Sequence, residues 1–144
     1  MTPDVNVLVA ASRADHPHHD AAQTWLHSAM EGARNGIPLG LLGIVVASFL
    51  RLVTHRKVFV EPTPVATAIA YVDALLARPG VAMLASQDEW PRLRKLCLEL
   101  HLSDNEVPDA WIAASVLQRQ ETLATFDRDF VRLLPVNQLL LLTA

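Results

Sequence analysis

Apolar residues in this chain form two kinds of segment that alternate from one end to the other. In one kind, apolar positions recur three and four residues apart, which predicts helices with one inward face. In the other, short apolar runs lack a two-residue polar rhythm, which is typical of strands buried on both faces of a parallel sheet. The helical segments are 6–11, 18–35, 44–55, 63–77, 87–101 and 109–120, and the strand segments are 2–4, 37–42, 81–85, 122–126 and 136–143. This alternation predicts an α/β fold with a central, mainly parallel sheet covered by helices on both faces.

Local signals place several of the helix ends. Gly36 should stop the helix over 18–35, and Pro64 suits the first turn of the helix over 63–77. The last predicted helix opens at Asp109, directly after Pro108, and ends near Gln120. Asp109 is therefore expected in a first helical turn.

The composition predicts one folded domain spanning residues 1–144. Hydrophobic residues make up 51% of the chain and charged residues 19%, which is enough apolar material for a sizeable core. No run of eighteen apolar residues is present and the first residues do not resemble a signal peptide, so we expect a cytoplasmic protein without membrane association. The single cysteine, Cys97, excludes disulfide and zinc-thiolate frameworks.

Four aspartates stand where predicted strands end or a helix begins. Asp4 follows the first strand, Asp109 lies in a first helical turn, and Asp127 and Asp129 follow the strand over 122–126. Because the carboxyl ends of parallel strands meet at one edge of a sheet, these side chains should gather at a single rim. Each aspartate alone is more simply read as a turn residue or a helix N-terminal acid, so the joint pattern carries the prediction.

Carboxylates gathered in this way repel one another unless a cation compensates or some of them bind protons. Oxygen ligands select Mg²⁺ or Mn²⁺ over zinc. The formal net charge of −3 at first argues against a nucleic-acid partner. Discounting the four aspartates as metal-bound changes −3 to +1, so a metal ion can supply the positive field that phosphate needs.

Three motifs resemble those of PIN-domain ribonucleases. The stretch DVNVLV at 4–9 is similar to their D-x-N-x-L-[VI] opening, and NEVPDAWIAA at 105–114 is similar to N-x-x-x-D-A-x-[IL]-A-A. TFDRDF at 125–130 resembles the closing T-x-D-x-D-F. The motifs follow the family's order and spacing over nearly the whole chain. Chain length and the segment FLRLVTH at 49–55 resemble, more narrowly, the VapC-type toxins of bacterial toxin-antitoxin pairs.

The resemblance implies a PIN-like three-layer α/β/α sandwich and a metal-dependent endoribonuclease that hydrolyses RNA phosphodiester bonds. It further implies inhibition by a small cognate antitoxin, whose tail enters the acidic groove, and a homodimer. In this reading a metal-bound water attacks phosphorus, with Mg²⁺ as the ion and Mn²⁺ as its substitute. The metal ligands would be Asp4, Asp109 and Asp127, with Asp129 as a further catalytic acid and Asn6, Asn105 and Thr125 around them.

The sequence departs from the family pattern at Ser48. Many relatives carry a glutamate there, just before F-L-R, and no acid lies nearby on the same predicted helix. Ser48 could hold a metal-bound water but supplies no charge, so metal affinity should be lower or a second metal site incomplete. Glu106 could compensate, although a solvated loop acid is the simpler reading. The alternative function is a catalytically weakened PIN-fold module that binds a partner.

Basic, histidine and tryptophan clusters each have two readings. A basic group at the end of the helix over 44–55 either holds the RNA backbone or simply complements the helix dipole. The group His16, His18 and His19 is read as a polar loop and helix start rather than a metal site, and the tryptophans as core or dimer packing rather than base stacking. The basic group is Arg51, His55, Arg56 and Lys57. The early histidines are His16, His18, His19 and His27, and the tryptophans are Trp25, Trp90 and Trp111.

Other phosphoryl-transfer folds fit the sequence less well. A haloacid-dehalogenase-like phosphatase needs an aspartate two residues after its nucleophile, where this chain has Asn6. A receiver domain needs two adjacent acids after its first strand and a late lysine, and the last lysine here is Lys95. Serine-histidine-aspartate catalysis is disfavoured because no G-x-S-x-G turn occurs.

Overall fold

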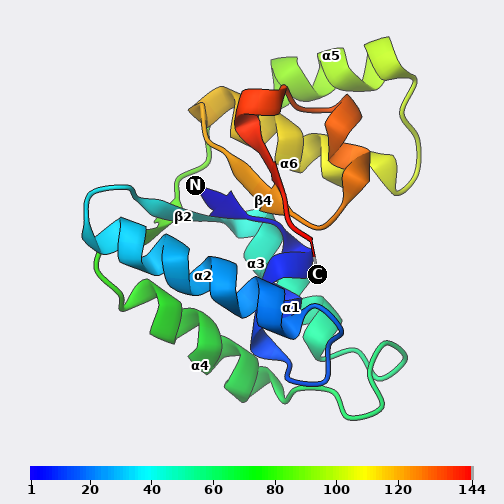
Figure 1. Cartoon of the computed structure of the whole chain (residues 1–144). Helices are drawn as coiled ribbons and strands as arrows, with labels where there is room; N and C mark the ends of the chain where they lie inside the picture. Colours follow the sequence, from blue (N-terminus) through cyan, green and yellow to red (C-terminus); the bar gives the residue numbers. More distant parts are fainter. Residues whose placement is uncertain (144) are drawn as a thin grey trace.

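A computed structural model describes residues 1–143 of the chain, drawn whole in Figure 1. Strands and helices alternate along most of its length. The strands are β1 (Thr2–Pro3), β2 (Leu39–Leu42), β3 (Val81–Leu84), β4 (Leu123–Thr125) and β5 (Leu139–Leu141). The helices are α1 (Val5–Ser12), α2 (His19–Arg34), α3 (Gly43–Val53), α4 (Val65–Leu76), α5 (Trp90–Leu100) and α6 (Glu106–Arg119), with 3₁₀ turns η1 (Arg128–Arg132) and η2 (Val136–Gln138).

Every strand pairing in the described chain is parallel. One ladder has the order β1-β4-β5 and a second pairs β2 with β3. The N–H of Gly40 in β2 donates to the carbonyl of Met1 at 2.9 Å and joins the two ladders. The resulting order β3-β2-β1-β4-β5 reverses direction between β1 and β4. Such a reversal opens a crevice beyond the carboxyl ends of the two strands, where α/β proteins bind their ligands.

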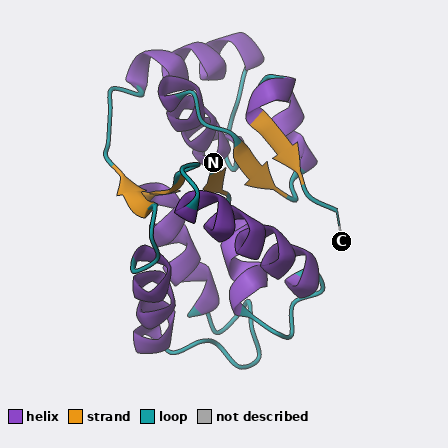
Figure 2. Ribbon diagram, turned by 60° about the vertical axis from the view of Figure 1, so that its left-hand side comes forward, coloured by secondary structure: helices purple, strands orange, loops and turns teal. Residues whose placement is uncertain are grey.

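Helices cover both faces of this sheet. Helices α1, α2, α3 and α4 pack on one another on one side, and α5 packs against α6 on the other. Figure 2 shows the two helical groups with the strands between them. The core includes side chains with no exposure above 1%, such as Leu8, Phe49 and Phe130. The predicted three-layer α/β/α architecture with a parallel sheet is confirmed.

Several element ends differ from the sequence prediction. Helix α6 begins at Glu106 rather than Asp109, because Pro108 falls in its first turn, where no N–H is needed for the helix. Helix α5 begins at Trp90, three residues later than predicted. Residues 136–138 form a 3₁₀ turn before β5, with Val136 exposed to solvent. These ends are set by tertiary packing, which sequence periodicity does not report.

The helices are short, and the longest, α2, is amphipathic. Its sixteen residues bury Ala22, Leu26 and Ala33. It ends at Arg34, and Gly36 follows with a φ of 98°, a conformation that favours glycine, as predicted. Throughout residues 1–143, no helix combines the length and the apolar composition needed to cross a bilayer.

Candidate active site

Asp4 lies at the end of β1, where it caps the N-terminus of α1. One carboxylate oxygen accepts the N–H of Val5 at 2.7 Å, and the other accepts the hydroxyl of Thr125 at 2.6 Å. The residue is only 5% exposed. Burial raises the pKa of Asp4 above its usual range, although its two hydrogen bonds partly oppose that shift and the charge of Asp127 adds to it. The sequence therefore builds a carboxylate that is held in place at the sheet edge.

Thr125, at the end of β4, connects the polar residues of the two strand ends. Its hydroxyl donates to Asp4 and accepts hydrogen bonds from the side-chain amide of Asn6 at 3.2 Å and from the N–H of Asp127 at 3.0 Å. A hydroxyl offers one donor and two acceptor positions, so the hydrogen-bonding capacity of the Thr125 hydroxyl is fully satisfied. The side-chain oxygen of Asn6 also accepts the N–H of Phe126 at 3.3 Å. These bonds fix the first and last acidic motifs relative to one another.

Asp109, in the first turn of α6, lines together with Asp4 a cavity of about 470 Å³. Burial, followed by the charges of Asp4, Asp127, Asp129 and Glu106, raises the pKa of Asp109 to about 6. These carboxylates therefore act on one another electrostatically. The cavity wall also contains Asn6, His16, Ser48 and Pro108, with the apolar residues Val5, Val9, Ile44, Leu52, Val58, Phe59 and Ile112.

A second, smaller cavity lies on the other side of Asp109. Its volume is about 130 Å³, and its lining includes Asp109, Asp129, Glu106 and Arg132. Arg132 forms an ion pair with Glu106 at 2.9 Å, while Asp127 accepts the N–H of Asp129 at 2.9 Å and caps η1. The carboxylate of Glu106 already has a cationic partner, so it is poorly suited to replace the missing acid at position 48.

The remaining residues named from the sequence occupy different positions around the site. Ser48 lines the larger cavity between the apolar wall residues. Asn105 precedes α6, is exposed and makes no capping hydrogen bond with its side chain. The basic residues Arg51, His55, Arg56 and Lys57 are exposed, and among residues 1–143 none of the four lines the larger cavity, although Leu52, Val58 and Phe59 beside them do.

His16 is a site residue that sequence reasoning missed. It was assigned to a polar loop, yet it lines the same cavity as Asp4 and Asp109. Its Nδ1 accepts the backbone N–H of His18 at 3.0 Å. The neighbouring histidines point elsewhere, because His18 stacks on Phe126 with ring centroids 4.6 Å apart and His19 bonds the carbonyl of Ala10. No sequence periodicity signals this placement, since a local turn produces it.

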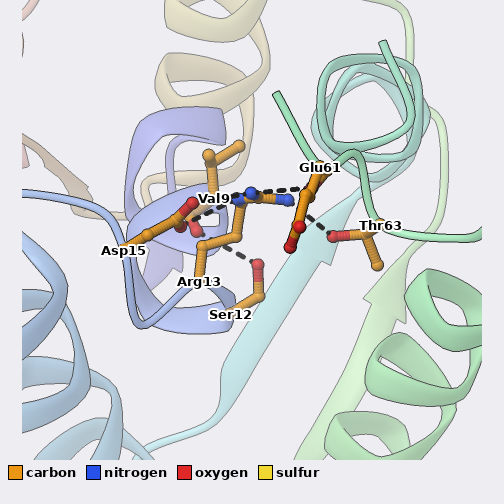
Figure 3. A network of polar contacts seen from close by, with 6 residues as sticks. All are labelled: Val9, Ser12, Arg13, Asp15, Glu61 and Thr63. Carbon is orange, nitrogen blue, oxygen red and sulfur yellow. Dashed lines mark hydrogen bonds and ion pairs between the residues drawn. The ribbon is translucent and has the colours of Figure 1, made fainter. Parts of the chain in front are cut away.

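Arg13 is a second residue that the sequence did not single out, and Figure 3 shows its contacts. Its side chain is 8% exposed and bonds Asp15 through two nitrogens at 3.0 and 2.8 Å. It also donates to the hydroxyl of Thr63 and the carbonyl of Glu61, both at 3.0 Å, and stacks 3.7 Å above the ring of Phe59. Arg13 thereby holds the segment 59–63, and with it one cavity wall, against the end of α1.

The tryptophans divide between the core and the surface. Trp25 is partly buried and packs against the core, as predicted. Trp90 and Trp111 are 64% and 46% exposed, so core packing is wrong for these two. For Trp90 and Trp111, dimer packing and base stacking remain predictions.

The donor set fits a hard divalent cation in its chemistry. Carboxylate oxygens of Asp4, Asp109 and Asp127 and the hydroxyl of Ser48 are ligands that Mg²⁺ and Mn²⁺ prefer. Burial first, and then the neighbouring carboxylates, raise the pKa of Asp109, and a bound cation would favour its charged form. As the side chains stand, no three acidic, histidine or cysteine residues within 1–143 are grouped closely enough to hold one ion. A bound ion would therefore need Asp109 and Asp127 to move toward Asp4, whose carboxylate is held by its two hydrogen bonds.

Comparison with known families gives the class of protein that this fold and site define. The sequence profile of the PIN domain family matches residues 1–133, and the chain belongs to that family. Within the family its relatives are VapC ribonucleases. Ribonuclease VapC25 of Mycobacterium tuberculosis is 36% identical over 137 residues, which cover 94% of each chain. VapC ribonuclease Mb2897 of Mycobacterium bovis is 40% identical over 130 residues, covering 90% of this chain and 86% of its own.

Solved structures of the family share the fold. VapBC2 from Rickettsia felis, bound to a DNA fragment from its promoter, superposes with a TM-score of 0.66 at 19% identity and covers 99% of this chain and 98% of its own. VapC20 of M. tuberculosis, a toxin that cleaves the sarcin-ricin loop, gives 0.64 at 16% identity, with 90% and 92% covered. At these identities the structural similarity shows the fold alone, and membership of the family rests on the sequence profile and the relatives above.

Proposed function

We propose that this protein is a metal-dependent endoribonuclease and the toxin component of a toxin-antitoxin pair. The observation that carries the proposal is that Asp109 shares a cavity wall with Asp4 and interacts electrostatically with both Asp4 and Asp127. A VapC ribonuclease relative 36% identical over 94% of this chain supports RNA as the substrate class. The Mycobacterium relatives share their name with the toxins of VapBC complexes, which supports a cognate antitoxin as the partner.

The proposal assigns a role to each acidic residue. Asp4, Asp109 and Asp127 would hold Mg²⁺ or Mn²⁺, and Asp129 would add negative charge beside them. A bound ion of this kind supplies charge neutralisation at the phosphate and lowers the pKa of water. Asn6 and Thr125 hold Asp4 and the chain at Asp127 in place through the hydrogen bonds described above. Arg51, His55, Arg56 and Lys57 would contact the RNA backbone outside the cavity.

The alternative of a non-catalytic partner-binding module is not favoured. It rests on the missing acid at Ser48, whereas the other acids of the motif are present and interact electrostatically. The VapC relatives are named as ribonucleases, which supports catalysis rather than binding alone. Ser48 should therefore affect metal affinity more than the existence of the activity.

Cleavage of RNA by the purified protein, with and without Mg²⁺ or Mn²⁺, tests this function. The Asp4→Asn variant is a sharp probe because asparagine still caps α1 while the charge is lost. We expect cleavage to need the metal, to stop in excess chelator and to fall by at least about 100-fold in the variant. Asp88→Asn, an exposed acid outside the cluster, should cleave like the wild type. Undiminished cleavage in chelator or in Asp4→Asn would reject the assignment.

The proposal extends to assembly and location. We expect a homodimer, a cognate antitoxin whose tail enters the acidic cavity, and a cytoplasmic location where RNA is available. Light scattering on the purified chain tests the dimer, and a monomer at micromolar concentration would contradict it. Sequencing the ends of RNA cut on expression would identify the substrate.

A further inference from the structure

We propose that His16 is a substrate-contacting residue of this ribonuclease site, with its Nε2–H donating a hydrogen bond to an oxygen of the RNA phosphodiester. The inference rests on the proposed function and deepens it. It starts from the position of His16 in the wall of the cavity that also contains Asp4 and Asp109.

The hydrogen bond at Nδ1 determines which ring nitrogen carries the proton. The backbone N–H of His18 is always a donor, so Nδ1 of His16, 3.0 Å away, must be the acceptor. A neutral imidazole that accepts at Nδ1 carries its proton on Nε2. Nε2 is thus a donor rather than a metal ligand, since its lone pair is not available. Burial and the neighbouring His18 also lower the pKa of His16, which favours this neutral form at pH 7.

The opposite edge of the His16 ring, at Nε2, is accessible to solvent. Within residues 1–143, the unpartnered buried polar atoms are in Thr2 and His18, and Nε2 of His16 is not among them. Nε2 also has no hydrogen-bond partner in that part of the chain, so it must be accessible to solvent. A donor that is fixed by the turn, accessible to solvent and carried by a residue of the cavity wall can meet a ligand there.

A phosphate in this cavity would find few other donors. Of the thirteen residues in the wall, those with a side-chain donor are Asn6, His16 and Ser48. One N–H of the Asn6 amide donates to Thr125 at 3.2 Å, and its second N–H has no partner within residues 1–143. The uncommitted donors beside Asp4 and Asp109 are therefore the Nε2–H of His16, the hydroxyl of Ser48 and the second N–H of Asn6. An anionic group placed among carboxylates needs such donors to offset repulsion, which is why the chemistry favours a phosphate oxygen as the partner.

Two substitutions separate the donor from the turn. Asparagine at position 16 keeps an oxygen that can accept the N–H two residues on, but it lacks a donor at the reach of Nε2. Glutamine places an N–H near the Nε2 position and gives up the turn acceptor. We expect His16→Asn to lower kcat/KM for RNA by about 10- to 100-fold and His16→Gln to stay within about threefold of the wild type.

Controls make the result specific. His27→Asn changes an exposed histidine of α2 that lines a separate small cavity, and it should cleave like the wild type. Mn²⁺ binding measured by calorimetry should be unchanged in His16→Asn and weakened in Asp4→Asn. Melting temperatures confirm that each variant is folded.

The outcomes distinguish this inference from the proposed function. Wild-type protein that fails to cleave RNA with any divalent metal would overturn the function itself. Active wild type together with a fully active His16→Asn would overturn the role of His16 alone. If His16→Gln loses as much kcat/KM as His16→Asn, or more, His16 acts through the turn. If Mn²⁺ binding is weakened in His16→Asn, His16 is a metal ligand. Either result also rejects the proposal.

Discussion

Replacing Asp109 with asparagine should stabilise the metal-free protein while abolishing its activity. The pKa of Asp109 is raised from 3.8 to about 6 by burial and by the surrounding carboxylates. A shift of roughly 2 units corresponds to about 3 kcal/mol, because each unit is worth about 1.4 kcal/mol. Asp109 is only half-buried, and solvent screening reduces this to about 1.5 kcal/mol. Asparagine loses about 0.5 kcal/mol of favourable interaction with the dipole of α6, so the net gain is about 1 kcal/mol.

The sign of the effect depends on pH. The folded state binds the Asp109 proton more tightly than the unfolded state does, so this group favours folding below pH 3.8 and loses that contribution as pH rises through 6. The advantage of Asp109→Asn should therefore be full above pH 6 and shrink toward pH 4. For a chain of 144 residues, 1 kcal/mol is about 3 °C in melting temperature.

Thermal unfolding in chelator at pH 7.5 and pH 4.5 measures this difference. Asp88→Asn is the matched control, because it removes an exposed aspartate outside the cluster. Adding Mn²⁺ should raise the melting temperature of the wild type more than that of Asp109→Asn, since the variant lacks one carboxylate of the proposed ligand set. A variant that is no more stable than the wild type at pH 7.5, or equally stabilised at both pH values, would refute the electrostatic reasoning.

Three further predictions concern residues around the same cavity. Ser48→Glu adds a carboxylate to the wall, so calorimetry should show Mn²⁺ binding tightened by about tenfold, and unchanged or weaker binding would contradict the proposed ligand set. Arg13→Leu removes the hydrogen bonds to the Thr63 hydroxyl and the Glu61 carbonyl, so the free energy of unfolding should fall by about 2 kcal/mol and proteolysis within residues 55–63 should be faster. An unchanged melting temperature would contradict the role of Arg13 in holding this segment. Thr125→Val keeps the shape of a fully buried side chain but leaves Asp4 without its hydroxyl donor. Denaturant titration should show a loss of about 2 kcal/mol in the free energy of unfolding, and a neutral effect would mean that water replaces the hydroxyl.

Sequence patterns alone determined the local structure of this protein. Apolar spacing identified the α-helices and strands of residues 1–143 to within a few residues but not the two 3₁₀ turns, and Gly36 ended α2 as predicted. The acids at Asp4 and Asp127 could be assigned to strand ends for the same reason. Periodicity and capping depend on neighbours within one or two turns of chain, and those neighbours are written directly in the sequence.

The tertiary structure alone decided which of these elements meet. Strand β1 lies beside β4, more than a hundred residues away, and that pairing brings Asp4 to Thr125. A turn places His16 in the cavity wall, and Arg13 reaches Thr63 across fifty residues. Contacts of this kind result from packing between segments distant in the chain, and no local spacing encodes them. The acids of the candidate site could therefore be named from residue types, whereas the cavity walls and the hydrogen-bond donors required the folded chain.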